Sequence, residues 1–432
     1  MEVVGQIVIY IMMAFVLIGA GAYISKPASG LGKEFKEGIL AIGHIFLPVG
    51  GVMVMVPVLV QIINHTAAPL YAWMHADPAL AAGTFIAGDM GGYQLAFELA
   101  DSHSAWIMAF VASFTAGSTI VFSIPVGLAL IDVRDHKYLA LGVMSGLLAI
   151  PFAVFAACLI LSSTGVLVRE DINTSGQGTA PFDLPLGEIL LNLLPLAVIM
   201  LLLALALRFF TGATIKAFLI FGRGLEMVLT AALAVAIVEY FTGIFSTVFG
   251  SWPLDPFIAD ADDQFRALEI AGYIGVMLSG AFPMVWAIRH GLEKPLEALG
   301  HRIGMSKEGM SGFLAAAANI LALFRIVSKM PPKEKVLTIA FAVCSAFLVG
   351  DHLAFTANFQ PSMIVAILGG KLTGGILAVF IALWLAVPQA RRLEAIDRET
   401  DVIGAEEYLS HEAAAGRDPR PGDEEPREPL AR

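Results

Sequence analysis

Two aspartates stand out because each lies beside glycines within an apolar stretch. Asp89 lies in the segment Gly88–Gly92, and Asp351 lies in the segment Val349–Phe355. An ionisable side chain at membrane depth is energetically costly and is by default a sign of function. The neighbouring glycines indicate interrupted helices, whose free backbone groups can face one enclosed polar site together with the carboxylate. We therefore predict that Asp89 and Asp351 form a site for a cation.

The residues around these carboxylates suit a small ammonium ligand. A buried carboxylate needs a positive partner, and aromatic faces attract an ammonium group by about 0.5 to 2 kcal/mol. Tyr93, Phe122 and Phe355 lie nearby in the sequence, and His352 can relay protons because imidazole titrates near neutral pH. Side chains that can bond a ligand hydroxyl are Gln94, Ser118, Thr119, Ser123, Asn319, Thr356 and Asn358.

A structural explanation stays open for each of these residues. Each Asp can cap a broken helix, aromatic residues in membranes mostly pack, and Ser and Thr often bond carbonyls of their own helix. A single His in a helix is more often a packing residue. The sequence assigns no role to His44, Glu239 or Lys371, which also lie at or near membrane depth.

The composition places these residues in a membrane protein. Hydrophobic residues make up 57% of the 432, charged residues 15%, against about 25% in soluble domains. Apolar stretches of roughly 18 to 30 residues recur along the chain, each long enough to cross a bilayer core as a helix. We therefore predict an all-α polytopic membrane protein that contacts the lipid bilayer.

Several function classes lack support in the sequence. Cys158 and Cys344 lie in apolar stretches, which argues against a disulfide scaffold or a Cys metal cluster. No Gly-x-x-x-x-Gly-Lys-Ser/Thr motif is present, so ATP hydrolysis is not expected. We predict no catalytic residue, cofactor or metal, and no nucleic-acid partner, and we leave open a homo-oligomer.

Charge distribution suggests a topology. Two short segments, 79–99 and 308–327, are broken by small residues. If both re-enter the membrane, the basic loops share one side, which the positive-inside rule places in the cytoplasm together with the C-terminus. The charged segment 389–432 is then predicted to be a disordered cytoplasmic tail. The expected spans are about 4–25, 38–63, 104–131, 138–163, 185–209, 213–245, 267–289, 334–361 and 364–388.

An internal similarity accompanies this topology. Residues 116–124 can be laid over residues 349–357, with Gly, Phe and a hydroxyl at matched positions. The halves 38–163 and 267–388 would then have opposite orientations within a transporter domain of residues 1–388. Inverted repeats with broken helices are typical of secondary transporters, which bind their ligand at the midplane. Chance similarity between helices rich in Gly, Ala and Phe is the alternative.

Several separate motifs resemble the ethanolamine utilization transporter family, EutH. They are Gly88–Gly92, Gly117–Val126, Tyr138–Val143, Glu293–Leu296 and Gly350–Phe355, and the likeness runs from about residue 5 to 388. The resemblance implies a bacterial inner-membrane permease for ethanolamine. The sequence departs from the family at Ala318–Leu321 and in its long acidic tail, which leaves the second half of the pocket and the exact amine open.

We therefore expect an alternating-access carrier that binds protonated ethanolamine between Asp89, Asp351, Phe122 and Phe355. A passive channel for a small amine is the alternative. An intramembrane aspartyl protease is disfavoured because the Gly-x-Gly-Asp and Tyr-Asp motifs of such enzymes are missing. The sequence does not show whether transport is coupled to protons or sodium.

Overall fold

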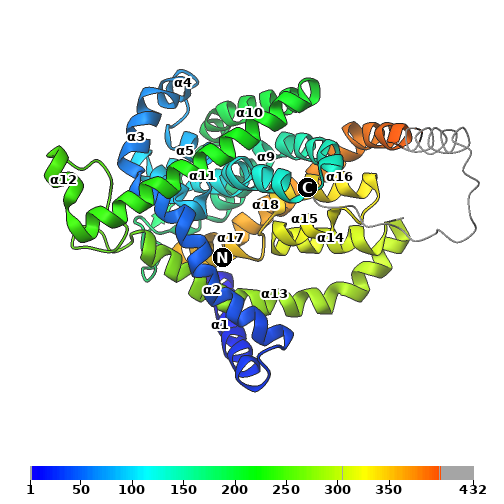
Figure 1. Cartoon of the computed structure of the whole chain (residues 1–432), viewed down its shortest axis with the longest axis horizontal. Helices are drawn as coiled ribbons and strands as arrows, with labels where there is room; N and C mark the ends of the chain where they lie inside the picture. Colours follow the sequence, from blue (N-terminus) through cyan, green and yellow to red (C-terminus); the bar gives the residue numbers. More distant parts are fainter. Residues whose placement is uncertain (1, 304, 398, 400–432) are drawn as a thin grey trace, which may run out of the picture.

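The computed structural model describes residues 2–303, 305–397 and 399, and most of these residues are helical (Figure 1). Among them, eight helices are long and apolar enough to cross a membrane. The prediction of an all-α polytopic membrane protein is therefore confirmed. The α-helices are α1 (Glu2–Ser25), α2 (Gly30–Val54), α3 (Val56–His65), α4 (Ala67–Trp73), α5 (Ala79–Phe85), α6 (Gly92–Leu99), α7 (His103–Ala112), α8 (Ile124–Leu130), α9 (His136–Thr164), α10 (Leu186–Phe209), α11 (Thr211–Thr242), α12 (Ile244–Phe249), α13 (Ala267–Ile303), α14 (Lys307–Ala318), α15 (Ile320–Val327), α16 (Pro332–Ser345), α17 (Asp351–Phe359) and α18 (Ile364–Leu385).

Short elements join these helices. Three are 3-10 turns, η1 (Gly88–Met90), η4 (Val133–Asp135) and η5 (Pro361–Met363), and two are π-helical, η2 (Ser113–Gly117) and η3 (Thr119–Ser123). The strands β1 (Leu167–Val168) and β2 (Ala180–Pro181) pair antiparallel, with Leu167 opposite Pro181. They close a loop between α9 and α10.

Two pairs of long helices form the frame of the molecule. Helix α2 packs along α13, and α9 packs along α18. Small residues four apart permit the second contact: a Cβ at Gly370 would lie 2.6 Å from Ala157 Cβ, and one at Gly374 would lie 2.4 Å from Ala153 Cβ. Such small-x-x-x-small patterns let helix backbones approach closely within a membrane.

The two short segments are broken, as the sequence predicted. In the first, α5 ends before η1 and α6 begins after it; in the second, α14 ends at Asn319, whose backbone is extended. The two arms of each segment pack against each other. The chain therefore turns back at η1 and again at Asn319.

Two expected spans differ from the structure. Span 334–361 is interrupted at residues 346–350, between α16 and α17, and span 38–63 is interrupted at Met55, between α2 and α3. The first break is sustained by hydrogen bonds from Phe347 N to Ala316 O, 3.2 Å, and from Val349 N to Ala317 O, 3.0 Å. Because these bonds replace the missing helical ones, an apolar sequence tolerates the break.

A buried ion pair fixes α16 to the turn before α9. Lys335 Nζ donates to Asp135 Oδ1 at 2.5 Å, and the two side chains are 9% and 11% exposed. Beyond α18, residues 387–397 are helical, so helix extends into the segment for which we predict a disordered tail. Residues 400–432 of that segment lie outside the described residues.

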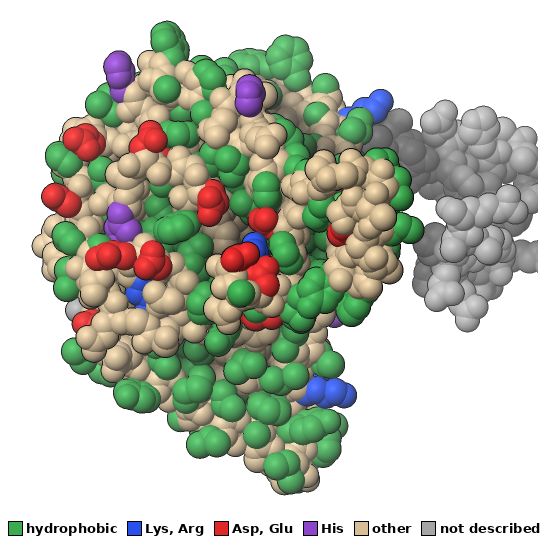
Figure 2. Space-filling view, turned by 90° about the vertical axis from the view of Figure 1, so that its left-hand side faces the viewer, with side chains coloured by type: hydrophobic (Ala, Val, Ile, Leu, Met, Phe, Trp, Pro, Cys, Tyr) green, Lys and Arg blue, Asp and Glu red, His purple; other side chains and the backbone are tan. Residues whose placement is uncertain are grey.

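One end of the bundle carries many acidic side chains. Figure 1 places α3, α4 and α12 together at one end, and Figure 2 shows Asp and Glu side chains spread over that end with few Lys or Arg among them. The predicted basic loops, such as Lys26 to Lys36 and Lys329 to Lys335, do not belong to these helices. Which end faces the cytoplasm stays a prediction.

Candidate substrate site

A cavity of about 350 Å³ brings the two predicted carboxylates together. Asp89 and Asp351 both line it. Four more predicted site residues, Ser118, Phe122, Asn319 and His352, share its wall. The predicted residues come from η1, from η3 and the residue before it, from the break after α14 and from the start of α17. Other lining residues are Glu37, His44, Arg325 and Phe347.

Asp89 is held by a tight turn that only glycine can complete. Gly91 has φ +96°, in the left-handed region, and a Cβ there would lie 2.7 Å from Val52 Cγ1. The Asp89 side chain is 17% exposed, and its Oδ2 lies 3.9 Å from His352 Nε2. Its Oδ1 has no hydrogen-bond partner within the described part of the chain.

His352 is buried between aromatic rings with its nitrogens unpaired. Its ring stacks on Phe114 with centroids 4.1 Å apart, and the Phe347 ring lies 5.3 Å away. Neither ring nitrogen has a hydrogen-bond partner in residues 2–303, 305–397 and 399. Buried polar atoms in native proteins are nearly always paired, so unpaired ones that face a cavity suggest a polar ligand.

Lys371, to which the sequence assigned no role, lies behind the cavity. Its side chain is buried, and Nζ donates to Phe114 O at 2.5 Å. Phe114 belongs to π-helical η2, where the irregular hydrogen bonding leaves carbonyls free to accept from a side chain. The ammonium group also lies near enough to Asp89 for the two charges to interact. Lys371 therefore stabilises both the π-helical segment and the carboxylate.

The remaining predicted residues lie away from this cavity. Phe355 is fully buried against Phe110 and Phe114, and Tyr93 OH accepts from Gln360 Nε2 at 2.9 Å. Gln94 lines a different cavity at the acidic end. The hydroxyls of Ser123 and Thr356 donate to carbonyls of their own helical segments, Ser118 O and His352 O.

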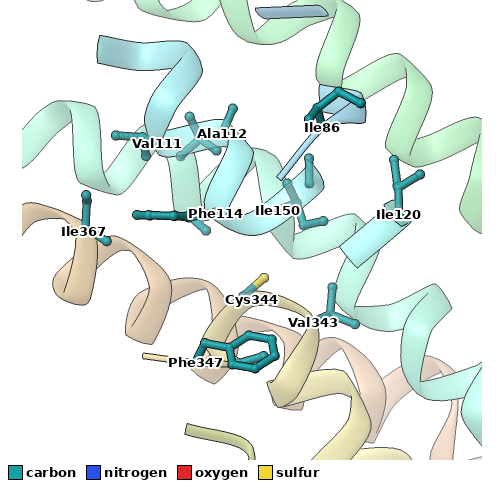
Figure 3. Packing of buried hydrophobic residues seen from close by; sticks show 14 of the residues in the cluster. Ile86, Val111, Ala112, Phe114, Ile120, Ile150, Val343, Cys344, Phe347 and Ile367 are labelled. Atoms are coloured by element: carbon teal, nitrogen blue, oxygen red, sulfur yellow. The ribbon is translucent and has the colours of Figure 1, made fainter. Parts of the chain in front are cut away.

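The aromatic residues form two matched pairs. Residues 114 and 122 align with residues 347 and 355 under the internal similarity. Phe122 meets Phe347 edge to face with centroids 5.8 Å apart, and Phe355 meets Phe114 edge to face at 5.7 Å. Figure 3 shows Phe114 and Phe347 in one core. The first pair lines the cavity, whereas the second is buried beside Tyr93.

Two matched glycines make equivalent contacts. A Cβ at Gly117 would lie 2.2 Å from Ile86 O, at the end of α5, and a Cβ at Gly350 would lie 2.3 Å from Ala318 O, at the end of α14. Because each glycine has no Cβ, its backbone can contact the backbone at the break in the neighbouring short segment, 79–99 or 308–327. The same backbone contact occurs in both halves.

Phe347 is the lining residue that sequence reasoning missed most clearly. It has φ +57°, which is uncommon for a bulky side chain and is costly unless the surroundings enforce it. Its position, three residues before Gly350, matches that of Phe114 before Gly117. The internal similarity extended upstream by two residues would have found it. Glu239, also left without a role, accepts from Phe245 N at 2.8 Å and caps α12.

Comparison with known proteins shows the family of the chain. The family model described as "Ethanolamine utilisation protein, EutH" matches residues 4–385. The chain belongs to the EutH family. It is 37% identical over 384 residues to the probable ethanolamine permease EutH of Listeria monocytogenes, covering 89% of this chain and 94% of the relative.

Other EutH relatives are similarly close. The probable ethanolamine permease EutH of Escherichia coli is 36% identical over 402 residues, covering 88% of this chain and 95% of that protein. The uncharacterized protein YxeR of Bacillus subtilis is 34% identical over 390 residues, covering 90% and 97%. No solved structure matches the chain. The EutH match and the permease names confirm the predicted family, and with it a membrane transport protein rather than an enzyme.

Proposed function

We propose that the chain is a permease that takes up ethanolamine, bound in its protonated form between Asp89 and Asp351. The observation that carries the proposal is the convergence of both carboxylates in one cavity of about 350 Å³. This volume lies within the range of about 300 to 1,000 Å³ for small-molecule sites. The names of the EutH relatives supply the substrate.

The chemistry of the cavity fits an amino alcohol. Ethanolamine carries one ammonium group and one hydroxyl. Asp89 Oδ1 and the Asp351 carboxylate supply negative charge, and the Phe122 ring offers a face that attracts an ammonium group. Asn319 Oδ1 already accepts from Leu321 N at 2.8 Å. The side-chain NH2 group of Asn319 is therefore the part that can donate to a ligand hydroxyl.

We propose that residues 38–163 and 267–388 are inverted repeats that exchange access between the two membrane sides. The matched pairs Phe122–Phe347 and Phe355–Phe114 support this arrangement, because one pair faces the cavity and the other is buried. In the opposite state the pairs exchange roles, so that Phe355 lines the open cavity. Phe355 then serves the substrate although it is buried in this state.

We propose that the cavity opens toward the cytoplasm. Its wall includes Glu37, His44 and Arg325, which are exposed and lie near the basic loops. Under the positive-inside rule this side is cytoplasmic, the C-terminus lies there as well, and the protein resides in the bacterial inner membrane. The structure is then the inward-facing state.

Transport by the purified full chain in proteoliposomes tests the function. We expect uptake of radiolabelled ethanolamine in mildly acidic medium, where the amine is protonated, and competition by unlabelled ethanolamine but not by neutral ethylene glycol. Unlabelled ethanolamine inside the vesicles should accelerate entry of label, because a carrier exchanges substrate. Uptake without such counterflow would support the passive channel instead, and uptake no faster than in protein-free liposomes would overturn both.

A further inference from the structure

A second cavity, of about 560 Å³, lies at the acidic end of the bundle. Its wall comes from α3, α6, the loop after β1 and the loop before α13. It shares no lining residue with the first cavity. The broken segment 79–99 reaches both, since η1 contributes Asp89 to the first cavity and α6 contributes Gln94 to the second.

The second cavity is strongly negative. Five carboxylates line it against one guanidinium, a formal charge of −4, and these side chains are Glu98, Asp171, Asp255, Asp262, Asp263 and Arg266. The guanidinium is shared, because Arg266 lies 3.6 Å from Asp255, 3.3 Å from Asp260 and 3.7 Å from Asp263. A cleft lined by one sign of charge concentrates ions of the opposite sign. Figure 2 shows Asp and Glu side chains spread over this end of the molecule.

Asp255 lies among other carboxylates. Burial raises the pKa of Asp255 above its usual value, Arg266 opposes the rise, and the carboxylates of Glu98, Asp263 and Asp260 add to it. A bound cation would offset both the burial of this carboxylate and its repulsion by the neighbouring ones.

Gln94 provides an independent sign of a ligand. Its side chain is 6% exposed, and neither Nε2 nor Oε1 has a hydrogen-bond partner among the residues that the structure describes. An amide buried with both ends unpaired requires an explanation in a native structure. Glu98 follows one helical turn later, so the amide and a carboxylate lie on the same face of α6.

The side chains that line the second cavity suit an organic ammonium ion better than a metal ion. In the described ranges, no group of three or more His, Cys, Asp or Glu side chains is arranged to hold a metal ion. An amide that can donate and accept, one turn from a carboxylate, matches a hydroxyl and an ammonium group two carbons apart.

We infer that this second cavity is an outer loading site, at which Gln94 binds the hydroxyl and Glu98 the ammonium group of a protonated amino alcohol. The inference rests on the proposed function and names a second site for the same substrate. In this inference, the buried cluster in which Tyr93 packs on Phe355 and Phe359 closes the way inward. The acidic wall raises the local concentration of the protonated amine, and the site binds the amine until the aromatic rings move apart.

Binding stoichiometry of radiolabelled ethanolamine to the purified full chain tests this inference. We expect two sites in the unsubstituted protein. Gln94→Leu should weaken one of them about tenfold, the effect of losing one hydrogen bond to a polar ligand. Glu98 is exposed, so Glu98→Gln should weaken the same site by no more than about fivefold. Asp351→Asn should remove the other site and leave this one. Asp183→Asn is the matched control, because Asp183 is exposed in the loop after β2 and does not line the cavity.

The outcomes separate the two proposals. A single site that Asp351→Asn removes and Gln94→Leu leaves unchanged would overturn the loading site and keep the proposed function. A single site lost in Gln94→Leu and unaffected by Asp351→Asn would keep the second cavity as a binding site and overturn the proposed central site. Absence of ethanolamine binding to folded protein would overturn both.

Discussion

Replacing Asp89 by Asn should nearly abolish ethanolamine uptake while the protein stays folded in the membrane. The substitution keeps the size of the side chain and removes its charge. Asp89 is 17% exposed and its Oδ1 is unpartnered, so an ammonium group bound there has exchanged water for this carboxylate. Removing one partner of a buried ion pair costs about 3 to 5 kcal/mol. The affinity for protonated ethanolamine should therefore fall by roughly 100-fold to several thousand-fold.

Glu37 provides the matched control within the same cavity. Glu37 lines the cavity but is exposed. An exposed ion pair contributes about 0 to 1 kcal/mol, so Glu37→Gln should change the affinity by no more than about fivefold. Initial rates of radiolabelled uptake over a range of ethanolamine concentrations, normalised to the amount of reconstituted protein, give both values. Equal effects of Asp89→Asn and Glu37→Gln would refute the reasoning from burial, and unchanged uptake by Asp89→Asn would remove Asp89 from the site.

Three further predictions concern the scaffold and the gates. Gly350→Ala should lower the thermal unfolding temperature in detergent, because its Cβ would lie 2.3 Å from a carbonyl oxygen and overpacking costs about 1 to 3 kcal/mol. Gly272→Ala is the control, because the space around Gly272 is open, and equal unfolding temperatures of the two variants would contradict the contact at Gly350. Asp135→Asn should destabilise the protein by about 3 to 5 kcal/mol, since it leaves a buried lysine unpaired, and an unchanged denaturant midpoint would contradict this. Phe355→Cys should react with an impermeant thiol reagent added outside only during ethanolamine exchange, whereas Phe347→Cys should react with the reagent added inside even without substrate. If Phe355→Cys stays unreactive during exchange, the proposal that the two aromatic pairs exchange roles is contradicted.

The sequence indicated a polar site at Asp89 and another at Asp351 because the physics involved is local, and the inferred repeat predicted that the two would meet. A carboxylate in an apolar stretch needs a polar site, and adjacent glycines allow the helix to break there. The breaks in segments 79–99 and 308–327 were predictable for the same reason. The EutH likeness was predictable because its motifs are contiguous in the chain.

Other features depend on long-range contacts that no local pattern records. The break at residues 346–350 lies in an apolar stretch, and its amides bond to carbonyls of Ala316 and Ala317, about thirty residues earlier. The partner of Lys371 is the backbone carbonyl of Phe114, which has no sequence signature. The role of Lys371 could therefore not be assigned before the fold was known.

Only one of the two predicted aromatic residues lines the cavity. Phe122 and Phe355 occupy matched positions, and both were expected around the ligand. The proposed inverted repeats would account for this difference, because matched residues in oppositely oriented halves would face opposite sides of the membrane. Phe122 lines the cavity and Phe355 is buried. Sequence alone does not specify which state a structure represents.

An experimental structure of the full chain with ethanolamine bound would test the central claim most directly. We predict ligand density in the cavity of about 350 Å³, with the ammonium nitrogen within hydrogen-bonding distance of the carboxylates of both Asp89 and Asp351. Ethanolamine bound elsewhere in the transporter, with that cavity empty at saturating ligand, would contradict the claim.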